Sequence, residues 1–221
     1  MQPSEHYRAV RSQVSDLVRD LTPEQQETRV PGCPAWTVRQ LVSHLSGLAT
    51  DLANGRFEGA GSPPWTALQV GDRQSTSIGD LLVEWDTQAP VVESVMDELG
   101  EAGVRIYFDA AMHEDDLREA LGQPASTSPT HDAVLRGLVW SAGQRLTKAG
   151  LPALTISAGE LELVAGDGES AAAVTVSDAG ELARAVAGRR SLSQIAAYAW
   201  QGDALSYAAH LPMFAPGEPA A

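Results

Sequence analysis

The sequence predicts a mainly α-helical chain, with a helical bundle over residues 1–149 and a small α+β domain over residues 150–221. Two observations lead to this prediction. Before Gly150, apolar residues recur every three or four positions in five long segments, which is the period of an amphipathic helix. After Gly150, the stretch LPALTISAGELELVAGDGESAAAVTVSD alternates apolar and polar residues between glycine-rich turns, which is typical of short strands.

The five helices are expected at residues 4–21, 38–55, 78–99, 104–121 and 133–148. The second begins with a capping-box pattern, Thr37 and Gln40, and has a fitting stop at Gly55. Pro90 lies inside the third helix and is expected to kink or break it, because proline removes a backbone donor. Residues 55–77 are rich in Gly, Pro and Ser, so we expect a long loop that serves function.

The C-terminal domain is expected to contain two or three short strands followed by two short helices. Asp178 and Glu181 cap the first of these helices, and Ser191 and Gln194 form a capping box for the second. Because the change of period falls at Gly150, we place the domain boundary there.

Composition restricts the partners that this chain can have. Of its 221 residues, 43% are hydrophobic, and the formal net charge is -14. Such a charge argues against nucleic acid and anionic membranes, which attract basic surfaces. The polar start MQPSEHYRAVRSQ lacks a signal-peptide pattern, so we expect a cytoplasmic protein, as a monomer or homodimer. The lone cysteine, Cys33, excludes an internal disulfide and favours a packed small residue.

Three residues suggest a metal site. His44 lies on the same helical face as Leu41 and Leu48, and Asp109 precedes His113 by four residues, so that each set shares a face. An imidazole and a carboxylate one helical turn apart can bind one cation, and His44 could supply a third ligand. This donor set suits Zn²⁺ with an open fourth position, although Ni²⁺ or Fe²⁺ could also bind. The alternative is a hydrogen-bonded core histidine and a surface pair.

The acidic residues that follow His113 are interpreted differently. Glu114, Asp115 and Asp116 are expected on a solvated face. One of them could instead orient a ligating imidazole through its second nitrogen.

Three motifs resemble the mycothiol-dependent maleylpyruvate isomerase family, within the wider DinB-like superfamily. CPAWTVRQLVSHL resembles its Pro-x-Trp-Thr-x-x-x-Leu-x-x-His-Leu signature, and FDAAMHEDDLREALG its second signature, with a carboxylate four residues before a histidine. ELARAVAGRRSLSQIAAYAWQGD is similar to the C-terminal half of many members. The motifs span nearly the whole chain in the expected order.

The resemblance implies a DinB-like four-helix bundle followed by a small α+β domain. It implies a divalent metal, usually zinc, held here by His44, Asp109 and His113, with Asp109 standing where the characterised isomerase has Glu. It further implies that a C-terminal arginine serves substrate binding or catalysis, for which Arg189 and Arg190 are the candidates by motif. Arg73, in the long loop, is a further candidate for binding the thiol cofactor.

Mycothiol is the low-molecular-weight thiol of actinobacteria. Lys148 is the one lysine among 15 basic residues, and this arginine bias fits a GC-rich genome of that kind. The resemblance therefore implies an enzyme that activates mycothiol as a metal-bound thiolate, for transfer to a small acidic electrophile or its cis–trans isomerisation. The alternatives are a metal-dependent hydrolase and a metal-free small-molecule binding or regulatory protein.

Overall fold

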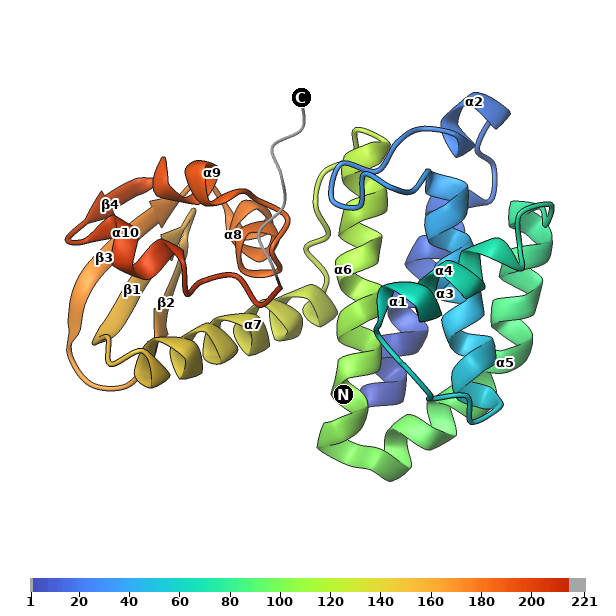
Figure 1. The fold of residues 1–221 in the computed structure, drawn as a ribbon, viewed down its shortest axis with the longest axis horizontal. Helices are drawn as coiled ribbons and strands as arrows, with labels where there is room; N and C mark the ends of the chain where they lie inside the picture. The colour runs from blue at the N-terminus through green and yellow to red at the C-terminus, as the bar shows by residue number, and fades with distance from the viewer. Residues whose placement is uncertain (1, 215–221) are drawn as a thin grey trace. The chain divides into compact units, whose positions relative to one another are not determined.

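Four long helices enclose the core of an N-terminal unit in the computed structural model, which describes residues 2–214 and, at 101 and 102, the backbone alone. The helices of this unit are α1 (Pro3–Val18), α2 (Pro23–Gln26), α3 (Val38–Ala53), α4 (Pro63–Gly71), α5 (Ile78–Leu99), the 3₁₀ helix η1 (Gly100–Gly103) and α6 (Val104–Ala120). Helices α1, α5, α3 and α6 form a closed ring in which each contacts the next (Figure 1). The predicted bundle is therefore confirmed.

Local signals explain why these helices begin where they do. The Thr37 side chain accepts a hydrogen bond from the backbone of Gln40, and the Gln40 side chain accepts one from the backbone of Thr37, as the capping box predicts. The apolar stripes then meet in the core, where Leu41 and Trp85 are almost completely buried. The indole of Trp85 donates to the Tyr7 hydroxyl over 2.6 Å, which satisfies a polar group that burial would otherwise penalise.

Two expectations for this unit need correction. The segment 55–77 contains helix α4, whose first residue is a proline that follows Ser62. Helix α5 continues unbroken through Pro90. Pro90 and Asp86, whose carbonyl loses its helical partner, are both exposed, so water can satisfy that carbonyl.

A four-stranded sheet forms the second unit, which begins at Ser126. Its elements are α7 (Pro129–Lys148), β1 (Ala153–Ala158), β2 (Leu161–Ala165), β3 (Ser170–Val176), α8 (Ala179–Val186), α9 (Leu192–Ala196), β4 (Ala199–Gln201) and α10 (Ala204–Ala208). The strand order is β2-β1-β3-β4, with β1 and β3 parallel and the outer pairs antiparallel. The strand β4 is a fourth strand, where the sequence predicts two or three.

Helix α7 packs against the sheet of the second unit. It contacts β1, β2 and α8 (Figure 1). For this reason the division by contacts falls between Ala125 and Ser126, whereas the sequence had placed it between residues 149 and 150. The change of period at Gly150 marks the end of a helix and not the start of an independently packed unit.

Gly143 lets α7 approach the turn after β2. A β-carbon at this position would lie 2.3 Å from the backbone nitrogen of Gly166. We expect Gly143→Ala to lower the free energy of unfolding by about 1–3 kcal/mol, because the turn must move away. Urea unfolding followed by circular dichroism measures this change.

Gly71, at the end of α4, is the matched control for Gly143. A β-carbon there would meet nothing within 4 Å. Gly71→Ala should therefore be neutral or stabilising by up to about 1 kcal/mol. Equal stability of the two variants would contradict the packing described for α7.

Within the described part of the chain, no helix combines the length and the apolar character that a bilayer crossing requires.

Candidate functional site

Three side chains from α3 and α6 converge inside the N-terminal unit. The Nε2 atom of His44 lies 3.7 Å from Oδ2 of Asp109, and Nε2 of His113 lies 3.7 Å from Oδ1 of the same carboxylate. One ligand atom from each residue lies within 4.8 Å of the others, so the three could hold one metal ion. The structure thus brings together the three residues that the sequence singled out.

The second nitrogen of each imidazole has its own acceptor. Nδ1 of His44 lies 2.7 Å from Oε1 of Gln69, and Nδ1 of His113 lies 3.0 Å from Oδ2 of Asp116. Because an amide carbonyl and a carboxylate accept hydrogen bonds, a neutral imidazole in either place carries its proton on Nδ1. The Nε2 lone pairs then face Asp109, which is the arrangement that metal-ligating histidines have.

Burial and aromatic contacts hold the two imidazoles in place. His44 is 4% exposed and His113 is 6% exposed. Their ring centroids lie 5.1 Å apart with planes at 85°, and the Trp36 ring lies 5.1 Å from the His44 ring. The Asp109 side chain is 34% exposed, although its Oδ2 atom, which faces His44, is buried. The sequence alone does not predict that Trp36 lies against His44.

The acidic residues after His113 are not on a solvated face, which corrects the prediction. Glu114 is 0% exposed, Asp115 8% and Asp116 1%. Glu114 accepts a hydrogen bond from Arg118 one turn later, over 2.7 Å. Asp116 lies behind His113, so the alternative interpretation, in which one of these carboxylates orients an imidazole, agrees with the structure.

Cys33 contacts Asp116, the residue that accepts from Nδ1 of His113. Its Sγ donates to Oδ2 of Asp116 over 3.6 Å, and Cys33, His113 and Asp116 are close enough to form a second possible ligand group. The two groups share His113, which can offer Nε2 to the first or Nδ1 to the second. Two imidazoles and a carboxylate form a common zinc donor set, whereas the second group would require the thiol to lose its proton.

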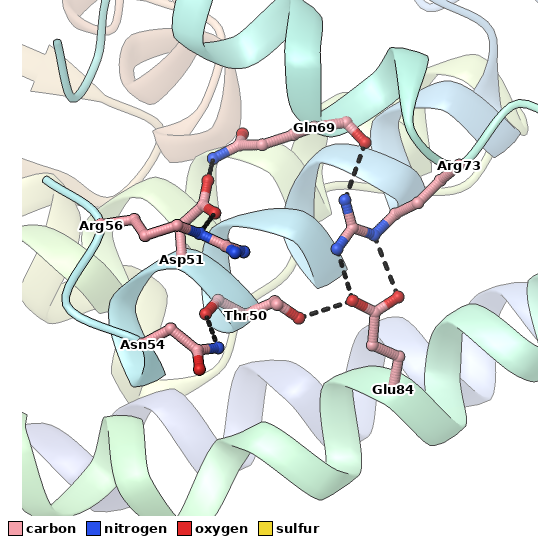
Figure 2. A network of polar contacts seen from close by, with 7 residues as sticks. All are labelled: Thr50, Asp51, Asn54, Arg56, Gln69, Arg73 and Glu84. Atoms are coloured by element: carbon pink, nitrogen blue, oxygen red, sulfur yellow. Dashed lines mark hydrogen bonds and ion pairs between the residues drawn. The ribbon is translucent and has the colours of Figure 1, made fainter. Parts of the chain in front are cut away.

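Arg73, the predicted thiol contact, follows α4 and points toward α5. Its Nε donates to Glu84 over 3.0 Å, its Nη2 pairs with the same carboxylate, and its Nη1 donates to the backbone oxygen of Gln69 over 3.0 Å (Figure 2). Arg73 therefore fastens α4 to α5.

A pocket of about 540 Å³ opens beside this network. Its lining includes Asp51, Arg56, Trp65, Gln69 and Arg73. The Oε1 atom of Gln69 contacts His44, so the side chain of Gln69 belongs both to the pocket lining and to the surroundings of the histidine group.

Removing the Glu84 charge should lower the free energy of unfolding at neutral pH and have less effect at acid pH. Burial by itself would raise the pKa of Glu84, but hydrogen bonds from Arg73 and Thr50 outweigh it and hold the pKa below its usual value. Such a carboxylate stabilises the folded state above its unfolded pKa, about 4.3, and loses that effect as the pH falls through the folded pKa. Glu84→Gln should lower the free energy of unfolding at about pH 7 by about 1–2 kcal/mol.

Urea unfolding of Glu84→Gln and the parent chain tests this dependence. The difference should shrink as the comparison is repeated at falling pH, because the parent carboxylate takes up its proton when the pH passes through its lowered pKa. A difference that stayed constant with pH would contradict the account.

The two C-terminal arginines lie between α8 and α9. Arg190 binds Glu181 through Nε and Nη2, at 2.9 Å and 2.7 Å, and Tyr198 donates to the same carboxylate. Nη1 of Arg189 donates to the backbone oxygen of Ala187 over 3.4 Å. Arg190 thus has a structural partner, and a role for either arginine in substrate binding or catalysis stays a prediction.

Comparisons with known proteins agree with the motifs. Residues 7–121 match the model of the mycothiol maleylpyruvate isomerase N-terminal domain. Among solved structures, a mycothiol-dependent maleylpyruvate isomerase is similar with a TM-score of 0.55 and 16% identity, covering 85% of this chain and 88% of that one. A histidine-to-alanine mutant of such an isomerase has the same TM-score and 15% identity over the same shares. At this identity the likeness shows the fold. No curated protein matches the chain.

Proposed function

This chain belongs to the mycothiol maleylpyruvate isomerase N-terminal domain family, and from that premise we propose that it is a metal-dependent enzyme that uses mycothiol. Its substrate would be a small electrophilic acid, to which the thiol is transferred or whose double bond is isomerised. One observation supports this proposal above the others. The Nδ1 atom of each imidazole has a hydrogen-bond acceptor, and both Nε2 atoms face the Asp109 carboxylate.

The donor set fits a divalent cation. His44 and His113 would each offer Nε2, and Asp109 a carboxylate oxygen, a set that suits Zn²⁺ and leaves one position open. Ni²⁺ or Fe²⁺ could use the same ligands. When bound, such a cation lowers the pKa of a thiol that it coordinates and so supplies the reactive thiolate at neutral pH.

The chain's own residues would hold and orient the reactants. Trp36 borders His44, and the thiol would approach from the side of Asp109, whose side chain is 34% exposed. Arg189 or Arg190 would bind the carboxylate of an acidic substrate, for which a guanidinium has the right geometry. Arg73 remains the proposed contact for the thiol's polar part, although Glu84 already takes two of its donors.

The covalent steps need no redox partner. The thiolate sulfur forms a bond to one carbon of the activated double bond, and the π electrons move to the conjugated carbonyl oxygen. The former double bond is then single and can rotate. When the electrons return, the carbon–sulfur bond breaks, which releases the trans isomer and the thiolate. If the adduct instead takes up a proton at carbon, the reaction ends as a transfer.

A thermal shift with mycothiol tests the proposal. A ligand that binds only the folded state raises the apparent melting temperature. We expect zinc-loaded protein to melt higher with mycothiol, to show no shift with glutathione, and to lose the mycothiol shift in His113→Ala.

The two alternative functions predict other outcomes. A hydrolase on this scaffold would bind zinc and cleave a substrate without any response to mycothiol. A metal-free binding protein would contain little zinc, and His44→Ala would not change that content. The first result would overturn the proposed use of mycothiol, and the second would overturn the proposed dependence on a metal.

A further inference from the structure

Gln69 contacts the histidine group from the side opposite to Asp109. It is 2% exposed. Its Oε1 lies 2.7 Å from Nδ1 of His44. Its Nε2 donates to Oδ2 of Asp51 over 2.7 Å, as Figure 2 shows. The other oxygen of Asp51 accepts from Nε of Arg56 over 2.8 Å. A chain of three hydrogen bonds thus runs from the pocket to the imidazole.

The polarity of this chain follows from Asp51. An ionised carboxylate only accepts hydrogen bonds, so the amide nitrogen of Gln69 must face Asp51. The amide oxygen then faces His44, and Nδ1 of His44 must be the donor. A neutral imidazole has one proton, and for that reason Nε2 keeps its lone pair toward Asp109.

The backbone of Gln69 is held from two sides. Gly47 allows α4 to lie directly on α3, because a β-carbon there would come within 2.7 Å of the Gln69 β-carbon. Arg73 donates to the Gln69 backbone oxygen while it binds Glu84 on α5 (Figure 2). The backbone position from which the Gln69 side chain reaches His44 is therefore fixed.

We propose that Gln69 is a positioning residue, which fixes the Nδ1–H tautomer of His44 so that Nε2 is available to a metal ion. This proposal rests on the proposed function in one respect, which is that a metal ion binds Nε2 of His44. Gln69 is a neutral partner, whereas Asp116 presents a carboxylate to His113. Asp51 fixes which way the Gln69 amide points, and the amide oxygen in turn fixes the proton of His44 on Nδ1. Because the amide is neutral, it adds no second negative charge next to the imidazoles.

Two variants separate this role from simple packing. Gln69→Leu keeps the buried volume but removes both hydrogen bonds. The double variant Gln69→Glu with Asp51→Asn exchanges the carboxylate and the amide, since the carboxylate introduced on α4 can accept from His44 and also from the amide introduced on α3. Gln74→Leu, an exposed position just after α4, is the matched control.

Two measurements read the effect. Long-range ¹H–¹⁵N spectra of the metal-free protein, at a pH where the imidazoles are neutral, report the tautomer of His44. Competition with a chelator gives the affinity for zinc. We expect Gln69→Leu to populate both tautomers and to weaken zinc binding about 10–100-fold, while the double variant and Gln74→Leu keep the parent tautomer and an affinity within a few-fold.

An unchanged His44 tautomer in Gln69→Leu would overturn the proposal, and so would a double variant that behaves like Gln69→Leu. The double variant also keeps the proposal testable if Gln69→Leu does not fold. Neither measurement uses mycothiol or turnover. A protein that binds zinc but ignores mycothiol would therefore contradict the proposed function and leave the role of Gln69 standing, and the tautomer can be measured even if no metal binds.

Discussion

His113→Ala should weaken zinc binding by more than about 100-fold, beyond the usual effect of changing an outer partner of a metal ligand. The reason is that His113 is one of three proposed ligands, and its Nε2, which lies 3.7 Å from Asp109, has no replacement in the variant. Chelator competition on the purified variant measures the affinity.

The control for His113→Ala is Glu114→Gln. Glu114 is the next residue on α6 and is fully buried against Arg118, but it belongs to neither possible ligand group. It should keep the parent affinity even if its stability falls. Equal losses in the two variants would mean that the ligands lie elsewhere.

Asp116→Leu should have the second-largest effect, a loss of about 10–100-fold in zinc affinity. Asp116 is 1% exposed and accepts from Nδ1 of His113 over 3.0 Å. Without that acceptor, the proton can move to Nε2, and the nitrogen that should bind the metal becomes a donor. Asp116→Asn keeps an acceptor and should lose less.

Asp115→Asn is the control for the Asp116 series. It changes a neighbouring buried carboxylate that belongs to neither ligand group, so the affinity should stay at the parent value. If Asp116→Leu bound zinc as tightly as the parent, the orientation of His113 would not depend on Asp116.

Much of the bundle could be predicted because its signals are local. The capping box at Thr37 and the apolar stripe of α3 lie within a few residues of each other, and the spacing of Asp109 and His113 fixes their common face. Helix α4 was not predicted, because the glycines, prolines and serines of residues 55–77 favour a loop. Ser62 followed by Pro63 is a helix-start signal that could have indicated it.

The partners of the two imidazoles depend on contacts that one sequence does not reveal. Gln69 reaches His44 only because α4 docks on α3 at Gly47, and no periodicity predicts which helices come that close. The contact between Asp116 and His113 could be predicted, since the two residues lie three positions apart on one helix. The burial of Asp116 could not be predicted, because a run of acidic residues is usually solvated.

Anomalous diffraction from crystals of the zinc-loaded protein would locate the cation that we propose His44, Asp109 and His113 share. We expect an anomalous peak between Nε2 of His44, Nε2 of His113 and the Asp109 carboxylate. A peak at Cys33 and Asp116 with Nδ1 of His113, or protein that takes up no zinc, would contradict it.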